Sequence, residues 1–304
     1  MEEIIFIIKG ILEQGFIYGI LALGIYITYE ILDYPDLSVD GTFPLGAAIT
    51  AALILKGVNP WAAILLSFAG GALAGLATGI FHVVFGIKDL LSGILTMTAL
   101  YSVNLKIAGK ANVPITNETT IFNSGISKVI PESIGRYKTL LIIFLCTIVI
   151  KKVLDWYLKT KSGLLLRATG DNPGMVTLLA RNYGHMKIIG LMICNGLAAV
   201  GGSILAQQQR YFDSTMGTGM LVMGLASVII GRSIFKNCRF INGTTMVLIG
   251  SIIYKTCLAA AIYVGVDPND LKLLMTILFL IVLISNNALG KGGAIRNVRT
   301  SKNQ

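Results

Sequence analysis

Long runs of apolar residues dominate the chain, and short polar stretches separate them. Nine runs have the apolar character of membrane segments, at residues 11–31, 43–55, 61–87, 90–108, 139–157, 188–208, 218–230, 244–264 and 271–288. A helix that crosses a bilayer at right angles needs about 20 apolar residues, and the runs at 43–55 and 218–230 are shorter. The pattern predicts an all-α, polytopic membrane protein with nine transmembrane helices, or ten if one span is missed, in one domain over residues 1–304.

The composition indicates that lipid is the solvent of this chain. Of the 304 residues, 54% are hydrophobic and 13% are charged, whereas a soluble domain carries about 25% charged residues. The net charge of +10 would suggest a nucleic-acid partner in a soluble protein. Here the basic residues lie mostly between and after the apolar runs, so we attribute the charge to membrane topology and expect no nucleic acid.

Basic loops predict the orientation of the chain. Lys and Arg are frequent in the loop 158–187, in the loop 231–240 and in the tail after residue 288. With nine spans these three regions lie on one side, which the positive-inside rule makes cytoplasmic, and the N-terminus lies outside. The loop 109–138 is also basic, so a tenth span and the side of the N-terminus stay open. The loop 158–187 is cytoplasmic in both cases.

The sequence lacks the common motifs of catalysis and metal binding. The phosphate-loop string GxxxxGK[ST] does not occur, so we expect ATP to be bound by a partner and not by this chain. Two histidines and four scattered cysteines suggest neither a metal site nor a disulfide framework. Because GxSxG and HExxH are also missing, we predict that the chain is not an enzyme.

A stripe of small residues in the third run predicts close helix packing. Its members follow one another at i, i+4 spacing: Ser67, Gly71, Gly75 and Gly79. They lie on one helix face and form a smooth groove for a neighbouring helix. Packing explains this stripe better than a substrate site does.

Two stretches of the chain resemble each other. Residues 34–36 read YPD and residues 211–213 read YFD, and each is followed by Gly-Thr, at 41–42 and 217–218. Each copy follows a long apolar run, and the copies are five spans apart, so they would be inverted in the membrane, as in many transporters. We interpret 10–110 and 188–290 as two repeat halves. We predict that the copies form pathway or gate elements at opposite ends, through Tyr34, Asp36, Asp40, Gly41, Thr42, Tyr211, Asp213 and Thr215.

The carboxylates near the first copy have two interpretations. Glu30, Asp33, Asp36 and Asp40 follow one another closely after the first run. Carboxylates in the apolar zone of a membrane protein often serve ion coupling or line a pathway. Alternatively, Ser38 or Asp40 caps the next helix by accepting its free N–H groups. The sequence leaves both interpretations open.

The loop 159–187 contains a predicted amphipathic helix. Residues 171–173 read DNP, which suits an N-cap followed by a first turn, and Met175, Leu178 and Leu179 share one apolar face. An apolar face outside the bilayer needs a cover, either the membrane surface or another subunit. The segment comprises Asp171, Asn172, Pro173, Gly174, Met175, Leu178, Leu179, Ala180, Arg181 and Asn182.

Several stretches, in this order, resemble the branched-chain amino-acid permease family of ABC importers. They are residues 15–24 (GFIYGILALG), 35–38 (PDLS), 163–168 (GLLLRA), 171–173 (DNP) and 196–202 (GLAAVGG). The resemblance covers about residues 10–290. It implies a bacterial inner-membrane subunit with the type II, vitamin B12-importer-like fold, which forms a dimer of permeases. It further implies two ATPase subunits that hold ATP and Mg²⁺, an extracytoplasmic binding protein that delivers the cargo, and a coupling helix at residues 171–182.

The substrate is less clear from the sequence than the family. The acidic stretch 33–41 (DYPDLSVDG) departs from the usual family pattern and resembles a branch associated with tryptophan or tyrosine uptake. We therefore expect an amino acid, aromatic if this branch holds, although sugar and nucleoside permeases share the broader family. The alternative from another class is a stand-alone, ion-coupled carrier or channel that uses the carboxylates at 33–40. A docking helix in the loop argues against that alternative, because such a carrier does not need one.

Overall fold

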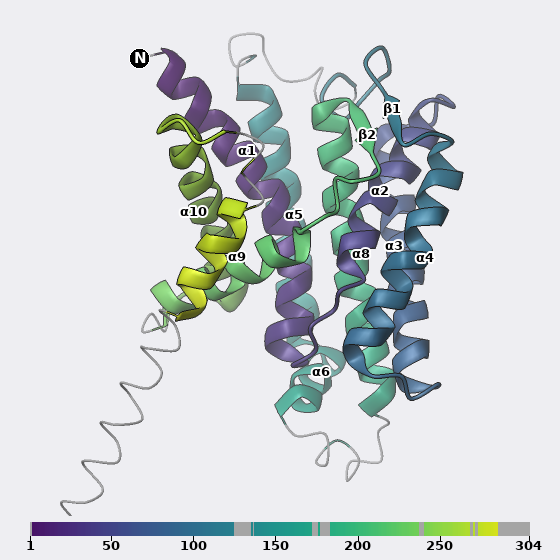
Figure 1. Cartoon of the computed structure of the whole chain (residues 1–304). Helices are drawn as coiled ribbons and strands as arrows, with labels where there is room; N and C mark the ends of the chain where they lie inside the picture. Colours follow the sequence, from purple (N-terminus) through teal and green to yellow (C-terminus); the bar gives the residue numbers. More distant parts are fainter. Residues whose placement is uncertain are drawn as a thin grey trace, which may run out of the picture.

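The computed structural model describes residues 2–124, 135, 137–171, 176, 183–236, 240–267, 270 and 273–284. The fold is mostly helical (Figure 1). The helices are α1 (Glu2–Ile25), continued by the π-helix Tyr26–Ile31, then α2 (Val39–Ile54), α3 (Pro60–Val83), α4 (Asp89–Ala108), α5 (Lys138–Lys159), α6 (Lys161–Asp171), α8 (Tyr183–Gln209), α9 (Met220–Ile234), α10 (Gly243–Tyr263) and a last helix at Leu273–Ile284. Two short strands are β1 (Asn112–Pro114) and β2 (Tyr211–Asp213).

Helices occupy each of the nine predicted membrane segments. In the part of the chain that the structure describes, five are long and apolar enough to cross a membrane: Ile5–Ile31, Pro60–Val83, Asp89–Ala108, Tyr183–Gln209 and Gly243–Tyr263. The helices Val39–Ile54, Met220–Ile234 and Leu273–Ile284 are apolar but shorter. The chain is therefore a multi-pass membrane protein, and the exact number of its spans stays a prediction.

The strands β1 and β2 correct the expectation of an all-α fold. They pair antiparallel, with Val113 opposite Phe212, and the ladder continues on both sides. Ile115 N donates to Arg210 O at 2.8 Å, and Ser214 N donates to Ala111 O at 2.9 Å. Three-residue strands are too short to show a period-two pattern in the sequence. The ribbon lies at the upper end of the molecule in Figure 1 and joins the segment after α4 to the segment after α8.

Helices α2 and α9 are short because each begins inside the molecule. In Figure 1 the chain turns back into the interior from the lower end of α1 before α2 begins, and it descends from β2 before α9 begins. An ion pair between Glu30 and Arg232 places the end of α9 beside the π-helix. Half-helices whose N-termini lie inside a membrane domain are typical of transport pathways.

Small residues bring α3 and α8 into backbone contact. The buried face of α3 includes the predicted stripe of Ser67, Gly71, Gly75 and Gly79. A Cβ atom added to Gly71 or Gly75 would overlap a backbone oxygen of α8, that of Asn195 or Leu191. Helices in lipid associate through such close packing because apolar burial gives them little driving force.

Hydroxyl groups add hydrogen bonds at the same interface. Thr50 Oγ1 of α2 lies 2.6 Å from Ser203 Oγ of α8 and 3.0 Å from Ser67 Oγ of α3. Ser67 Oγ in turn donates to Gly46 O at 3.0 Å. Each such bond between membrane helices contributes only about 0.6 kcal/mol on average, so together they mainly fix the register of α2, α3 and α8.

Candidate functional site

Two turns lead into the short helices, and they share one backbone geometry. Residues 33–38 form the first turn and residues 210–215 form the second turn. Each begins with a left-handed residue, Asp33 at φ 52° and Arg210 at φ 61°, and within the described residues no other non-glycine residue has a positive φ. This conformation costs about 1–2 kcal/mol for an L-residue. Its use at two corresponding positions marks the points where the chain reverses toward the interior.

An aspartate closes each turn in the same way, three residues after the left-handed residue. Asp36 Oδ1 accepts hydrogen bonds from Ser38 N at 2.9 Å and from Ser38 Oγ at 2.6 Å. Asp213 Oδ1 accepts hydrogen bonds from Thr215 N and Thr215 Oγ1, both at 2.6 Å. Such Asx turns arise when a short carboxylate side chain bonds the backbone two residues further on. The similarity seen in the sequence therefore includes the same hydrogen-bonded turn.

The first turn is locked by a buried amide of α8. Asp36 and Ser38 are fully buried. Asn195 Nδ2 donates to Asp36 Oδ2 at 2.7 Å, and Asn195 Oδ1 accepts a hydrogen bond from Thr42 Oγ1 at 2.6 Å. A carboxylate away from water needs such donors because its desolvation is costly. Asn195 thereby fixes the start of α2 on the middle of α8.

The second turn is held mainly through the backbone. Its strand β2 pairs with β1, and Arg210 Nη1 donates to Thr116 O at 2.8 Å. Asp213 is half-buried and Thr215 is exposed. The second turn therefore lies nearer the surface than the first.

The starts of α2 and α9 meet at Asp40. Its Oδ2 accepts a hydrogen bond from Gly219 N at 3.0 Å, and its Oδ1 accepts one from Leu221 N at 2.7 Å. These N–H groups lie at the N-terminus of α9, so Asp40 of α2 caps α9. Pro44 removes the N–H that would bond the Asp40 carbonyl within α2, and a Cβ atom on Gly217 would overlap that carbonyl oxygen.

A cavity of about 300 Å³ lies beside this junction. It is lined by Asp40, Gly41, Pro44, Met97, Thr98, Tyr101, Asn104, Ser214, Thr215 and Thr218. Three of the predicted pathway residues, Asp40, Gly41 and Thr215, therefore line the same cavity. Asp36 and Thr42 belong to the buried network around Asn195.

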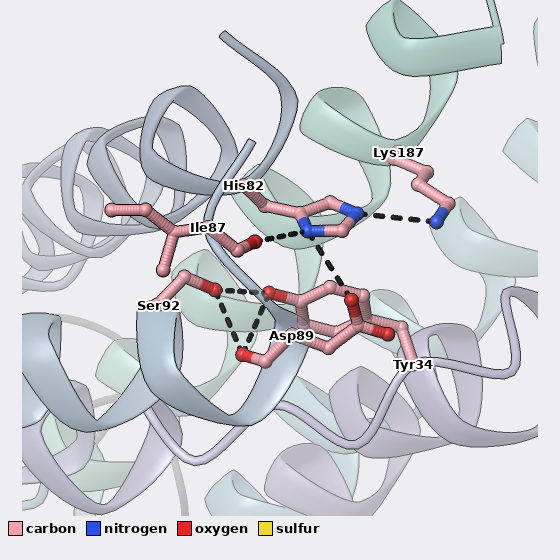
Figure 2. Close-up of polar contacts among 6 residues, drawn as sticks. All are labelled: Tyr34, His82, Ile87, Asp89, Ser92 and Lys187. Atoms are coloured by element: carbon pink, nitrogen blue, oxygen red, sulfur yellow. Dashed lines mark hydrogen bonds and ion pairs between the residues drawn. The ribbon is translucent and has the colours of Figure 1, made fainter. Parts of the chain in front are cut away.

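Near the beginning of the first turn, Tyr34 belongs to a cluster of contacts that involves α3, α4 and α8 (Figure 2). Tyr34 OH lies 2.6 Å from Ser92 Oγ and 3.2 Å from the carbonyl oxygen of Asp89, both on α4. His82 Nδ1 at the end of α3 lies 3.2 Å from Asp89 Oδ1. Lys187 Nζ of α8 lies 3.2 Å from His82 Nε2. The cluster therefore connects the first turn to Lys187, which is the last residue of the predicted loop 159–187 and lies near the start of α8.

The two similar stretches begin far apart and meet only at their inner ends. Tyr34 lies in the cluster of Figure 2, and Tyr211 lies in β2 at the upper end of Figure 1. The inner ends of the stretches, however, meet where Asp40 bonds Gly219 and Leu221. The chain enters from the lower end at the first turn and from the upper end at the second, so the two stretches begin at opposite ends and approach each other inside the molecule. Their role as gates stays a prediction.

The four acidic residues after α1 disperse into separate roles. Glu30 forms an ion pair with α9, Asp33 is exposed, and Asp36 and Asp40 bond different elements. The prediction that Ser38 or Asp40 caps the next helix, α2, is wrong. Asp40 caps α9 instead, and Ser38 makes no side-chain capping bond to α2. In the described part of the chain, no three His, Cys, Asp or Glu side chains gather to hold a metal ion.

Most of the predicted coupling segment lies outside the described residues. This applies to Asn172, Pro173, Gly174, Met175, Leu178, Leu179, Ala180, Arg181 and Asn182. Asp171 is described as the last residue of α6. The predicted amphipathic helix after it stays a prediction.

Sequence reasoning missed two amides on long helices. Asn195 on α8 holds the first turn, and Asn104 on α4 donates from Nδ2 to Gly41 O at 3.0 Å. Both are buried. The available signal was a polar side chain inside an apolar run, which is costly in lipid and therefore a sign of function or of a specific partner.

Comparison with known proteins bears on the whole chain. A family model described as "Branched-chain amino acid transport system / permease component" matches residues 7–284. The tyrosine transport system permease protein of Clostridioides difficile (strain R20291) is 43% identical over 280 residues, which cover 92% of this chain and 91% of the relative. The ribose import permease protein RbsC of Escherichia coli (strain K12) is 26% identical over 286 residues, which cover 91% of this chain and 84% of the relative.

A solved structure shares the fold. It is the PsaBC complex of Streptococcus pneumoniae bound to a Fab, one chain of which matches with a TM-score of 0.52 and 14% sequence identity. The match covers 90% of this chain and 89% of that chain. At this identity the likeness concerns the fold alone.

Proposed function

The chain belongs to the branched-chain amino acid transport system permease family, and from this premise we propose that it is the membrane-spanning permease subunit of an ATP-driven ABC importer for an amino acid. The structural observation that supports the proposal most directly is the junction at Asp40. Two half-helices that enter from opposite ends meet there beside a cavity. Such a junction can change which side of the membrane reaches the cavity.

The substrate proposed is an aromatic amino acid, with tyrosine as the first candidate. The support is the tyrosine transport permease that is 43% identical over nearly the whole chain, together with the acidic stretch 33–41. The ribose permease is more distant at 26% identity, so a sugar is the weaker candidate. A substrate-binding protein outside the cell would deliver the cargo and set much of the specificity.

The ATPase subunits are proposed to dock on residues 171–182, on the cytoplasmic side. The segment lies between α6 and α8, and Lys187 near the start of α8 contacts His82. His82 and Tyr34 both contact Asp89. A push on the docking segment would therefore reach the first turn through side chains already in contact. ATP and substrate must favour different conformations, because a ligand with equal affinity for both shifts neither.

The wider architecture follows the same proposal. Residues 10–110 and 188–290 would be inverted repeats, supported by the shared turn geometry at Asp33–Asp36 and Arg210–Asp213. The permease would have the type II fold, act as a dimer of two copies in the bacterial cell membrane, and expose the C-terminus to the cytoplasm. The N-terminus would then lie outside, where Figure 1 draws α1 beginning at the end opposite α6.

The decisive experiment is gentle purification of the chain from its native membrane, followed by mass spectrometry. An ATPase subunit in stoichiometric amount, and ATP-dependent tyrosine uptake after reconstitution with the binding protein, are the expected results. A chain that purifies alone and transports solute alone would overturn the importer proposal and favour an ion-coupled carrier.

The docking site has its own test. The double change Leu178→Asp with Leu179→Asp should release the ATPase and stop uptake while the membrane helices stay folded. A matched control is Leu164→Asp, because Leu164 on α6 is an exposed leucine of the same loop and lies outside the docking segment. Retention of the ATPase by the double variant would refute the assignment of residues 171–182.

A further inference from the structure

The cavity beside Asp40 has an unusual charge pattern. Among the described residues that line it, Asp40 is the only charged one, and the others carry hydroxyl, amide or apolar groups. We propose, on the basis of the function proposed above, that this cavity binds the substrate by its ammonium group. The permease would then select amines during passage, in addition to any selection by a binding protein.

Asp40 has acceptor capacity left for such a ligand. A carboxylate offers about four acceptor positions, and the backbone N–H groups of Gly219, Met220 and Leu221 engage three of them. The N–H groups at the N-terminus of α9 favour its charged form and offset part of the cost of burial. An ammonium group is complementary to the position that remains, because it carries only donors and a positive charge.

Asn104 supplies a second acceptor on the same wall. Its Nδ2 donates to Gly41 O at 3.0 Å, whereas its buried Oδ1 has no hydrogen-bond partner among the described residues. A buried acceptor without a donor is unfavourable. An N–H donor of the ligand, reached after a small movement of the α4 wall, would satisfy it.

The rest of the cavity suits an apolar side chain. Pro44, Met97 and Tyr101 contribute its apolar surface, and the Tyr101 side chain is 52% exposed, so its ring is accessible to a ligand. A sulfur and an aromatic ring both make favourable contacts with another ring. The volume of about 300 Å³ lies at the lower end of small-molecule pockets, which hold about 300–1,000 Å³. One amino acid with a large apolar side chain therefore fits the chemistry better than a polar sugar does.

The test is equilibrium binding of radiolabelled L-tyrosine to the purified full-length chain in lipid nanodiscs. Tyramine keeps the ammonium group and lacks the carboxylate, whereas 3-(4-hydroxyphenyl)propionate keeps the carboxylate and lacks the ammonium group. We expect tyramine to compete with tyrosine, and the propionate and ribose not to compete. Competition by the propionate without competition by tyramine would overturn the proposal, as would the lack of saturable tyrosine binding.

Variants place the binding in this cavity. Asp40→Asn keeps a side chain that can cap α9 but loses the charge, and it should weaken tyrosine and tyramine binding by about ten- to hundredfold. Asp155→Asn is the matched control, because Asp155 lies on α5 and does not line the cavity. If Asp40→Asn fails to fold, Tyr101→Leu on the exposed wall should weaken tyramine binding by several fold. Unchanged binding by either folded variant would contradict the assignment.

The outcomes separate this inference from the proposed function. ATP-dependent uptake with an unchanged Asp40→Asn variant would retain the importer and reject the ammonium site. Specific amine binding by a chain that never associates with an ATPase would retain the ammonium site and reject the importer.

Discussion

The first and second turns share a local design and differ in their surroundings. In the first turn, Asp36 is fully buried, and Asn195 donates a further hydrogen bond to its second oxygen. In the second turn, the bonds between Asp213 and Thr215 lie at an exposed position. The same Asp-x-Ser/Thr pattern forms the same turn in both places because an Asx turn is a local structure. The surroundings decide how firmly each turn is held.

The difference suggests which side of the junction moves. The first turn is bonded to α8 through Asn195 and to α4 through Tyr34, so we expect it to behave as part of the scaffold. The second turn is held by a short ribbon, and Asp40 holds only the start of α9 that follows it. We therefore expect conformational change to begin at the second turn.

The largest effect should follow loss of the buried carboxylate. Asp36→Ala leaves the N–H groups of Asn195 and Ser38 without their acceptor, and it should lower the free energy of unfolding by about 3–5 kcal/mol. Thermal unfolding of the purified chain in detergent measures the change. Asp36→Asn, which keeps one acceptor oxygen, should lose less, and equal losses for both variants would refute the role of the hydrogen bonds.

The next effect concerns the point where the turns meet. A Cβ atom on Gly217 would overlap Asp40 O and would lie 2.5 Å from Pro44 Cδ, so Gly217→Ala should cost about 1–3 kcal/mol of stability. It should also reduce uptake, because the start of α9 must shift away from α2. Gly10→Ala is the control, since a Cβ atom there meets nothing within 4 Å. A Gly217→Ala protein as stable and as active as this control would show that the contact is unimportant.

A smaller effect is expected where the first turn joins α4. Tyr34→Phe removes the hydroxyl group that lies 2.6 Å from Ser92 Oγ, at a cost of about 1 kcal/mol in the free energy of unfolding. If the cluster transmits the push of the ATPase, the variant should also need more ATP hydrolysed for each substrate moved. The comparison is Tyr263→Phe, because Tyr263 is 78% exposed. Identical coupling ratios in the two variants would argue against transmission through Tyr34.

The smallest effect on stability should come from the second turn. Asp213→Ala removes two hydrogen bonds at an exposed position, where water can replace them, so the loss should be about 0.5–1 kcal/mol. Its consequence should be kinetic, with faster hydrogen exchange in the residues 214–219 than in the wild type. A loss of stability as large as that of Asp36→Ala would abolish the distinction between the turns.

Local chemistry explains which features were predictable from the sequence. The apolar runs predicted the helix positions, because a chain in lipid must bond its backbone internally. The similarity of residues 34–36 and 211–213 indicated two related turns, because the aspartate acts on residues next to it. The cap that Asp40 provides for α9 and the amide of Asn195 beside Asp36 were not predictable, because both depend on segments far apart in the chain. The ribbon of β1 and β2 was missed for the same reason, and its strands are short.

Glycine contacts also have a mechanical consequence. Gly46 and Gly71 pack closely on the backbone of α8. Gly231 and Gly250 allow the same close packing between α9 and α10. We expect each group to behave as a stiff body, because an interface without side chains cannot adapt by changing rotamers. The hydrogen bonds at Asp40 join one body to the other. Bonds to a charged group contribute about 1.5–3 kcal/mol each, so the separated form would be rarer by a factor on the order of 10² to 10⁴. The protein would rest with its two bodies joined, and mechanical work supplied from outside would be needed to part them.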